Sequence, residues 1–464
     1  METITLFHTN DMHSHLEYWP RIAQKLRSKK MELLDRKESV FVFDSGDAGD
    51  RIHPLTEATD GQFISELLNE AYYDIVTIGN NEGIGNTKQQ LNQLYDKAKY
   101  SVVVSNIKER NTLKQPEWAD EFHILTTQKG YKLGVIGCTI PLPTSYELLG
   151  WDIENPIDAI HRLIKTYKES VDGFILLSHL GIHTDREIAA RFKEIAVIMG
   201  GHTHHLLPEG EQVNHTLIAG AGKFGKHVGQ ISLHMIGSYH FKAQARVFNA
   251  ETDIPPLRGE KKRITRLNRK GKHLLQEKKI AYLQEPFEID WQRCTNFVSF
   301  TLKMLIEKTE ADLSIINSGL FLKPLLKGLV SFNDIHESLP HPMRLLTFHI
   351  KGEDLIELIH SMEEQRTRLR HLPTAGFGFR GQLFGEICYS GIQKKNDEFR
   401  VNEKLLHPNH WYKVATVDYF LYVPFFPIIE ERTHPRMEYP DFLRTLVANE
   451  LKENYPVPKR KERK

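Results

Sequence analysis

The chain of 464 residues has little cysteine, almost no net charge and no long apolar run. Its cysteines, Cys138, Cys294 and Cys388, lie far apart, so we expect no disulfide framework and a reducing compartment in which the thiols act as small apolar side chains. A formal charge of +1, from 61 basic and 60 acidic residues, excludes a global field that draws in nucleic acid. No apolar run approaches the ~20 residues that cross a bilayer.

The amino terminus and two basic stretches bear on where in the cell the protein is expected and on what it is expected to bind. Residues 1–8 lack a basic n-region, an apolar h-region and a small-residue cleavage site, and they read directly as a first strand. Lysine and arginine gather at 258–279 and 458–464, which a solvated connecting helix and a frayed terminus explain. We therefore expect a cytoplasmic protein with no nucleic acid, membrane or obligate protein partner.

The first half of the chain alternates short β-branched apolar runs with stretches of helical period. This alternation predicts an α/β fold with much parallel sheet, buried on both faces. Helices are expected at 21–28, 62–69, 88–97 and 157–168. Strands are expected at 4–9, 40–44, 75–79, 102–106, 133–137, 174–178, 196–200, 216–220 and 230–235.

The character of the chain changes after Thr252. Pro255-Pro256 breaks the last strand, and a charged, helix-favouring segment follows to about residue 283. A second region then begins with a helical pattern at 297–308 and continues as mixed strands and helices. We predict domains at 1–251 and 286–464, joined by a mostly helical linker at 252–285.

Five short polar motifs follow five different predicted strands. In an open α/β sheet the C-terminal strand ends form one rim, so side chains that are distant in sequence converge there. Glycines before three of the motifs let the backbone turn tightly as it leaves the strand. The motifs are Asp11-Met12-His13, Gly46-Asp47, Gly79-Asn80-Asn81-Glu82, Ser178-His179 and Gly200-Gly201-His202-Thr203-His204.

These residue types indicate a first-row metal site. Imidazole nitrogens together with carboxylate and carboxamide oxygens suit Mn, Fe, Zn, Co or Ni better than Ca or Mg. Asp11 and His13, two residues apart in an extended segment, point to the same side and can bind one ion. His202 and His204 repeat that spacing and can serve one ion each.

The remaining motifs complete a pair of ions. Asn80 and His179 suit the second ion, which leaves Asp47 free to bridge the two. Seven ligands for two ions leave positions open for water and substrate, as catalytic sites require. Any one of these motifs alone is more often a cap, a turn residue or a surface group. Their occurrence together, each after a strand, argues against coincidence.

The same motifs resemble those of the calcineurin-like metallophosphoesterases and, more narrowly, of the 5′-nucleotidase / UDP-sugar hydrolase family. The resemblance implies an N-terminal four-layer metallophosphoesterase β-sandwich flanked by helices and a C-terminal α/β substrate-binding domain. It also implies two divalent transition-metal ions, such as Mn, Zn or Fe, whose activated water attacks phosphorus in line. By this resemblance the first ion is held by Asp11, His13 and His204, the second by Asn80, His179 and His202, and Asp47 bridges them.

One position departs from the family in the catalytic motif. Most relatives have histidine where this chain has Asn81, and that histidine binds the phosphate or protonates the leaving group. Asn81 can donate a hydrogen bond but cannot act as a general acid. Two alternatives stay open: His15, His183 or His205 stands in, or the substrate has a leaving group that needs no acid.

The second domain departs more from the family. The family has a strand followed by the motif Asn-Gly-Gly-x-x-Arg. This chain has Asn317 and Gly319 at matching positions, but it lacks the arginine. Residues 411–420 resemble the strand that precedes the family's Gly-Gly-Asp-Gly-Tyr loop. In this chain, residues 422–427 stand in place of that loop. In the family that loop supplies an aromatic ring for stacking on the base, so this chain departs from the family at the position that binds the nucleobase.

A glycine-rich segment at 376–385 offers further candidate substrate-binding residues. Phe377 and Phe379 can stack on a base, and Arg380 can bind a phosphate. Equally, the segment can be a turn whose phenylalanines pack into the core. Phe420 is a weaker candidate.

The sequence thus predicts a metal-dependent phosphoric ester hydrolase, similar to 5′-nucleotidases, that acts on nucleotides or related small phosphate esters. A phosphodiesterase or pyrophosphohydrolase is the alternative among hydrolases, because loss of the acidic histidine matters less for diesters and anhydrides. A non-catalytic metal-binding scaffold is the alternative from another class, although Asp47 and the open coordination argue against it.

Overall fold

The computed structural model describes residues 1–374, 376, 378–395 and 398–458. They form two compact units, Met1–Gly271 and Lys272–Lys464. Helix α9 (Glu260–Glu277) crosses this division and lies within the segment that we predict as a linker. The domain boundaries taken from the sequence stay predictions.

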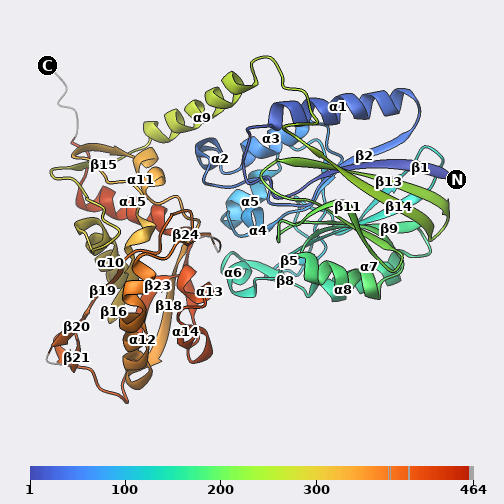
Figure 1. The fold of residues 1–464 in the computed structure, drawn as a ribbon. Helices are drawn as coiled ribbons and strands as arrows, with labels where there is room; N and C mark the ends of the chain where they lie inside the picture. Colours follow the sequence, from blue (N-terminus) through green and yellow to red (C-terminus); the bar gives the residue numbers. More distant parts are fainter. Residues whose placement is uncertain (375, 377, 396–397, 459–464) are drawn as a thin grey trace. The chain divides into compact units, whose positions relative to one another are not determined.

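The first unit contains two six-stranded sheets (Figure 1). In the first sheet, β1 to β4 are parallel, and the antiparallel strands β13 and β14 extend it beyond β1. Its order is β14 (His240–Asn249), β13 (His227–Gly237), β1 (Glu2–Thr9), β2 (Ser39–Asp44), β3 (Ile75–Val76) and β4 (Ser101–Val102).

The second sheet has four parallel strands in its centre and an antiparallel strand at each edge. Its order is β11 (Leu206–Val213), β12 (Thr216–Ala221), β10 (Ile195–Gly200), β9 (Gly173–His179), β7 (Lys132–Thr139) and β6 (His123–Thr126). The two sheets face each other across an apolar core, to which Leu6 and Phe43 contribute from one sheet and Ile175 and Val197 from the other.

Helices cover the outer faces of both sheets. Helices α1 (Trp19–Asp35) and α3 (Gln62–Glu70) lie beside the first sheet, and α7 (Pro156–Tyr167) and α8 (Ile182–Arg191) pack on the second (Figure 1). This order of layers confirms the predicted four-layer sandwich. Shorter elements connect them: α2 (Pro54–Ala58), α4 (Asn80–Gly83), α5 (Lys88–Leu94), β5 (Ile107–Glu109), α6 (Pro143–Leu148) and β8 (Trp151–Ile153).

The second unit is built on a five-stranded mixed sheet, which confirms the predicted α/β class. Its order is β19 (Ile387–Ser390), β16 (Leu313–Asn317), β23 (Trp411–Val417), β18 (Arg344–Lys351) and β24 (Arg436–Phe442). The packed helices are α10 (Asn296–Thr309), α12 (Gly352–Arg370) and α15 (Leu443–Asn454). The smaller elements are β15 (Lys279–Leu283), η1 (Ser318–Leu320), β17 (Gly328–Ser331), α11 (Phe332–Ser338), β20 (Ile392–Lys395), β21 (Glu398–Val401), β22 (Lys404–Leu405), α13 (Tyr419–Tyr422) and α14 (Ile428–Glu431).

The cysteines correct one expectation from the sequence. Cys294 and Cys388 form a disulfide with their Cα atoms 5.8 Å apart, and the free cysteine of the described residues is the buried Cys138. The separation of 94 residues hid this pair, because spacing along the chain does not show which distant segments meet. The cysteine argument for a reducing compartment therefore loses two of its three thiols.

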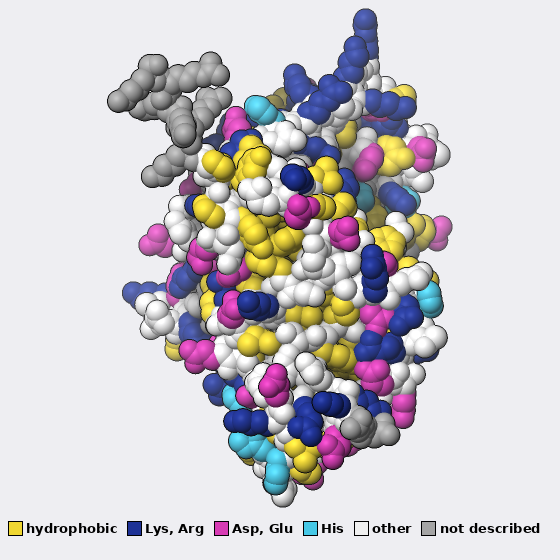
Figure 2. All heavy atoms as spheres, turned by 90° about the vertical axis from the view of Figure 1, so that its left-hand side faces the viewer, with side chains coloured by type: hydrophobic (Ala, Val, Ile, Leu, Met, Phe, Trp, Pro, Cys, Tyr) yellow, Lys and Arg dark blue, Asp and Glu magenta, His cyan; other side chains and the backbone are white. Residues whose placement is uncertain are grey.

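The surface and the helices add two observations. On the face in Figure 2, basic and acidic side chains are interspersed with apolar ones, so most of this face carries no continuous field of one sign. Among the described residues, no helix is both long and apolar enough to cross a membrane.

Candidate metal centre

The seven predicted ligands follow strand ends at one edge of the sandwich. Five of them have a backbone in the left-handed region, where residues other than glycine are uncommon: the φ angles are 50° at Asp11, 49° at His13, 54° at Asp47, 71° at His202 and 59° at His204. Each such conformation costs of order 1–3 kcal/mol and persists only where the surroundings impose it. Strain concentrated on these residues marks a functional site.

The loops after β1 and β2 impose this conformation on each other. The amide of Asp11 donates to the carbonyl of Gly46 at 2.9 Å, and that of His13 donates to the carbonyl of Asp47 at 2.8 Å. The expectation that Asp11 and His13 lie in an extended segment is therefore wrong. Their side chains converge because paired loops turn the backbone, which the spacing alone does not show.

Two of the glycines in the motifs are required for space rather than for a turn. A Cβ at Gly79 would lie 2.0 Å from Oδ1 of Asp47, and a Cβ at Gly201 would lie 2.9 Å from Nδ1 of His179. Neither glycine has a positive φ, unlike Gly46 with 92°. Close approach of the loops to the ligands therefore selects glycine at these two positions.

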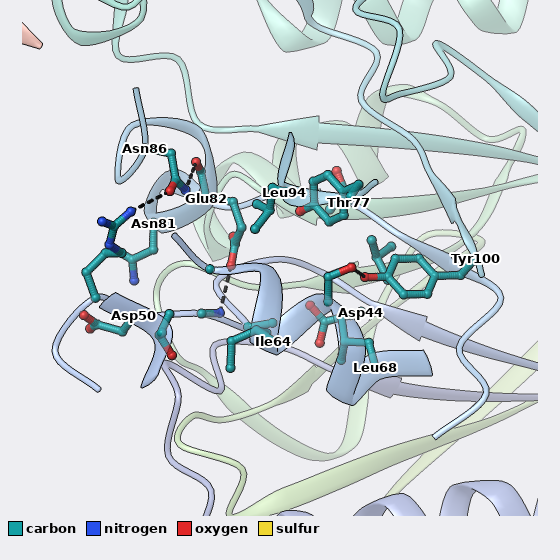
Figure 3. A pocket seen from close by; sticks show the side chains of 18 residues that line it. Asp44, Asp50, Ile64, Leu68, Thr77, Asn81, Glu82, Asn86, Leu94 and Tyr100 are labelled. Carbon is teal, nitrogen blue, oxygen red and sulfur yellow. Dashed lines mark hydrogen bonds between the residues drawn. The ribbon is translucent and has the colours of Figure 1, made fainter. Parts of the chain in front are cut away.

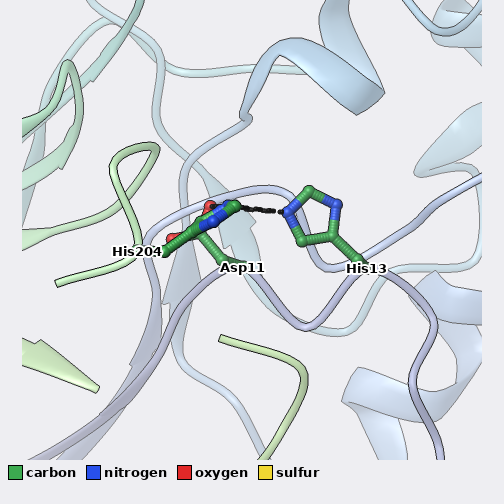
Figure 4. Close-up of side chains that lie close together, drawn as sticks. All are labelled: Asp11, His13 and His204. Carbon is green, nitrogen blue, oxygen red and sulfur yellow. Dashed lines mark hydrogen bonds and ion pairs between the residues drawn. The ribbon is translucent and has the colours of Figure 1, made fainter. Parts of the chain in front are cut away.

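Asp11, His13 and His204 form one candidate metal site (Figure 4). Oδ1 of Asp11 lies 3.4 Å from Nε2 of His204 and 3.7 Å from Nε2 of His13. The two Nε2 atoms lie 3.2 Å apart. These three donor atoms lie close enough together to coordinate one cation.

Asp11, Asp47 and His179 form a second group that can hold a metal. Nε2 of His179 lies 3.4 Å from Oδ2 of Asp47 and 3.9 Å from Oδ1 of Asp11. Oδ2 of Asp47 also lies 3.7 Å from Nε2 of His13, so this carboxylate reaches ligands of both groups.

Asn80 and His202 lie next to this second group. Oδ1 of Asn80 is 3.0 Å from Nδ1 of His202, whose ring centroid is 5.3 Å from that of His179. The structure thus brings all seven residues together. The assignment of each residue to an ion stays a prediction.

The side chain of His179 tests whether this set suits a metal. Its Nδ1 contacts the carbonyl oxygen of Ser45 at 2.8 Å, and an acceptor there requires that the ring proton sits on Nδ1. Its Nε2 is buried and has no hydrogen-bond partner within the described residues, yet it faces two carboxylates. A buried ring nitrogen without a partner is costly unless a cation binds it. The donor set therefore fits divalent metal ions.

The pKa shifts show that the carboxylates of this centre stabilise positive charge on the neighbouring histidines. Burial alone would lower the pKa of His179, but Asp47 and Asp11 outweigh it and raise the pKa to about 10. Burial opposes the same shift at His13, where the nearby carboxylates of Asp11, Asp50 and Asp47 raise the pKa to about 10. Protons or metal cations can supply the charge, and a metal displaces the protons when it binds.

Glu82 holds the loops around the centre and was not among the predicted site residues. Its buried carboxylate accepts hydrogen bonds from the amides of Asp47 at 2.9 Å, Gly49 at 2.8 Å and Gly79 at 2.9 Å. It joins the loop after β2 to the start of α4. Its place in the motif Gly79-Asn80-Asn81-Glu82 was the available signal, but a carboxylate three residues after a glycine is common in turns.

Phe224 is a second residue that the sequence did not single out. Its ring centroid lies 4.0 Å from that of His15, 5.8 Å from His13 and 6.3 Å from His204. Its φ of 63° is also left-handed, and its amide donates to the carbonyl of Asp11. His15 therefore packs against a ring that also contacts two of the predicted ligands.

The predicted substrate-binding residues are brought together in the second unit. The side-chain amide of the buried Asn317 donates to the carbonyl of Phe384, and Gly319 donates its amide to the same carbonyl at 3.1 Å. A Cβ at Gly319 would lie 2.0 Å from the carbonyl oxygen of Leu383. The glycine-rich segment therefore lies directly on the Asn317 turn.

The aromatic candidates are buried in this unit. Phe379 is 3% exposed and lies between His341, with ring centroids 5.0 Å apart, and Tyr419 at 5.2 Å. Phe420 is 1% exposed and stacks on Phe426. This burial favours core packing for both rings over contact with a ligand. Arg380 is partly exposed, and Phe377 lies outside the described residues.

Comparison with known proteins decides the family. Residues 4–206 match the calcineurin-like phosphoesterases, and residues 279–422 match the C-terminal domain of 5′-nucleotidase. The uncharacterized metallophosphoesterase YunD of Bacillus subtilis (strain 168) is 34% identical over 463 residues, which cover 97% of this chain and 99% of YunD. The chain belongs to the calcineurin-like metallophosphoesterases. It is therefore a metal-dependent phosphoester hydrolase with a C-terminal domain of the 5′-nucleotidase type.

Other similar proteins share a lower sequence identity with this chain. A 5′-nucleotidase of Rattus norvegicus is 24% identical over 260 residues, 51% of this chain and 45% of that protein, so the chain matches less than half of that relative's length. A putative 5′-nucleotidase of Staphylococcus aureus has the same fold, with a TM-score of 0.67, 16% identity and coverage of 99% and 98% of the two chains. The structure of the NAD nucleotidase of Haemophilus influenzae has a TM-score of 0.63 and 16% identity, with coverage of 98% of this chain and 96% of that chain.

Proposed function

We propose that this metallophosphoesterase hydrolyses phosphate esters of nucleotides at a centre of two divalent metal ions. Two observations carry the proposal: the predicted donor side chains converge in two overlapping groups, and the buried Nε2 of His179, which faces Asp11 and Asp47, has no hydrogen-bond partner among the described residues. Divalent cations bound there make water a better nucleophile at neutral pH and neutralise charge on the phosphoryl oxygens. The names of the 5′-nucleotidases among the relatives support a nucleotide substrate.

The residues of the chain have distinct parts in this proposal. Asp11, His13 and His204 hold one ion, Asn80, His179 and His202 hold the other, and Asp47 lies between them. Ser45 fixes the ring of His179 through Nδ1. Glu82 fixes the two loops that carry Asp47 and Asn80. The site is therefore held in place before substrate arrives, which is what electrostatic stabilisation of a transition state requires.

A second substrate class is favoured by Asn81. Its carboxamide cannot protonate a leaving group, so an alkoxide must leave without help from this position. Anhydrides of nucleotides release a phosphate, which is a far weaker base than an alkoxide, and therefore lose less from this change. We infer that such compounds are turned over well relative to alkyl phosphomonoesters. His15 is the candidate to compensate, because its ring packs against Phe224, which also contacts His13 and His204.

One substrate panel tests the proposal. The protein, loaded with Mn²⁺, is assayed on nucleoside mono-, di- and triphosphates, cyclic nucleotides, dinucleotides and UDP-sugars, with Asp47→Asn as the control. Hydrolysis that depends on Asp47 supports the proposal. Preference for anhydrides over monoesters supports the second substrate class, and preference for diesters supports a phosphodiesterase. If no compound is hydrolysed in an Asp47-dependent manner, the metal-binding scaffold is the better account.

Activity with His15→Asn separates the two explanations of Asn81. A selective loss on monoesters shows that His15 supplies the proton. Unchanged monoester turnover in this variant excludes that role.

A further inference from the structure

The side chain of Asn81 contacts a metal ligand rather than open space. Its amide nitrogen lies 2.7 Å from Nδ1 of His13, and Oδ2 of Asp50 lies 3.7 Å from the same ring nitrogen. The other ring nitrogen of His13, Nε2, faces Asp11, Asp47 and His204. Asn81 and Asp50 lie on the same side of the adjoining pocket (Figure 3).

The protons of the imidazole decide which way this amide must point. When Nε2 of His13 binds a cation, the ring carries its proton on Nδ1, and Nδ1–H needs an acceptor. An amide nitrogen cannot accept a hydrogen bond, whereas the amide oxygen can. The two ends of a carboxamide have nearly the same shape, so their assignment follows from the hydrogen bonds they make. With metal bound at Nε2, the amide would therefore have to turn its Oδ1 toward His13.

The backbone of Asn81 holds a second ligand. Its amide donates to Oδ1 of Asp47 at 2.8 Å, which leaves Oδ2 of Asp47 facing His13 and His179. Asn81 lies in α4, whose first turn is closed by Glu82, so its position is fixed by the same carboxylate that joins the loops. One residue therefore contacts two ligands, through its main chain and its side chain.

We propose that Asn81 is a positioning residue: its side-chain carbonyl accepts the Nδ1–H of His13 and orients that ring toward the first metal ion. The proposal rests on the proposed function, since it concerns the same centre. It gives the asparagine a part in metal binding in place of the proton transfer that it cannot perform. Partners of this kind typically change metal affinity by about 10–100-fold when they are removed.

Metal affinity, measured apart from activity, tests the proposal. Mn²⁺ binding to the full chain is followed by electron paramagnetic resonance for the wild type, Asn81→Leu and Asn81→Asp. We expect Asn81→Leu to weaken one Mn²⁺ site by about 10–100-fold, and Asn81→Asp, which keeps an acceptor oxygen, to stay within a few fold of the wild type. Asn92→Leu, at an exposed position of α5, is the control and should bind like the wild type.

A second measurement covers the case in which Asn81→Leu folds poorly. In the Zn²⁺-loaded wild type, we expect a protected Nδ1–H proton signal of His13 in nitrogen-edited NMR spectra, and we expect Asn81→Asp to retain it. A metal-bound His13 whose Nδ1–H exchanges freely in the wild type overturns the proposal. Equal Mn²⁺ affinity of Asn81→Leu and the wild type also overturns it, without affecting the proposed function. A wild type that binds no metal overturns both.

Discussion

Acid is expected to destabilise the second unit through His341. The ring is buried and neutral: Nε2 contacts the carbonyl oxygen of Leu320 at 2.8 Å, and Nδ1 accepts the amide hydrogen of Arg380 at 2.8 Å. A proton on Nδ1 would remove that second hydrogen bond and place a charge near Arg380 and Arg444. Burial first, and these two arginines after it, lower the pKa of His341 to about 3.

The sign and size of the effect follow from this shift. Between the ordinary pKa of about 6.5 and the folded value of about 3, the unfolded chain binds a proton that the folded chain refuses. Stability is therefore full above this window and falls as the pH falls through it, by about 1.4 kcal/mol per pH unit. At pH 5 the loss from this residue is about 2 kcal/mol.

A matched variant isolates this residue from other titrating groups. Chemical denaturation of the wild type and of His341→Gln is measured from pH 7.5 to pH 5, and hydrogen exchange of β18 and β23 reports the second unit. We expect the difference in free energy of unfolding between the two proteins to shrink by about 2 kcal/mol toward pH 5. A difference that stays constant over this range would show that protonation of His341 does not destabilise the second unit.

Three further outcomes are expected. A thiol count on the unfolded, unreduced chain should find Cys138 alone, and Cys294→Ser should lower the free energy of unfolding by about 4–5 kcal/mol, since the bond spans 94 residues; three thiols would contradict the disulfide. Gly201→Ala should lower the free energy of unfolding, measured by chemical denaturation, by about 1–3 kcal/mol. Gly237→Ala should not, because its added Cβ would have no atom within 4 Å; equal effects would show that the space at Gly201 is not needed. At saturating Mn²⁺, Asn81→His should hydrolyse alkyl phosphomonoesters about tenfold faster or more; an unchanged rate would contradict the missing-acid explanation.

The central strands of the first unit could be predicted because their apolar runs are buried on both faces. The runs at 4–9, 133–137 and 174–178 fall within β1, β7 and β9. The edge strand β14 was missed because its side chains alternate between half-buried and exposed, so it contains no apolar run. The same holds for β11, whose residues are all at least partly exposed.

The convergence at the centre could be predicted from strand order, but its local geometry could not. Parallel strands place their C-terminal ends on one edge, which is enough to gather Asp11 and Asp47 from the first sheet. His179 ends a strand of the second sheet and reaches them because the two sheets pack face to face, which strand order alone does not show. The left-handed backbone of Asp11 depends on a hydrogen bond to Gly46, more than thirty residues away, which no local pattern reveals. The burial of Phe379 against His341 has the same origin, because ring contacts across the second unit are set by tertiary packing.

The proposed centre binds two metal ions with Asp47 between them. Equilibrium dialysis of the full chain against Mn²⁺, followed by elemental analysis, measures this directly, with Asp47→Asn as the comparison. We expect about two ions per chain in the wild type and a clear loss of bound metal in the variant. A wild type that retains no Mn²⁺, or a variant that binds as much as the wild type, would contradict this expectation.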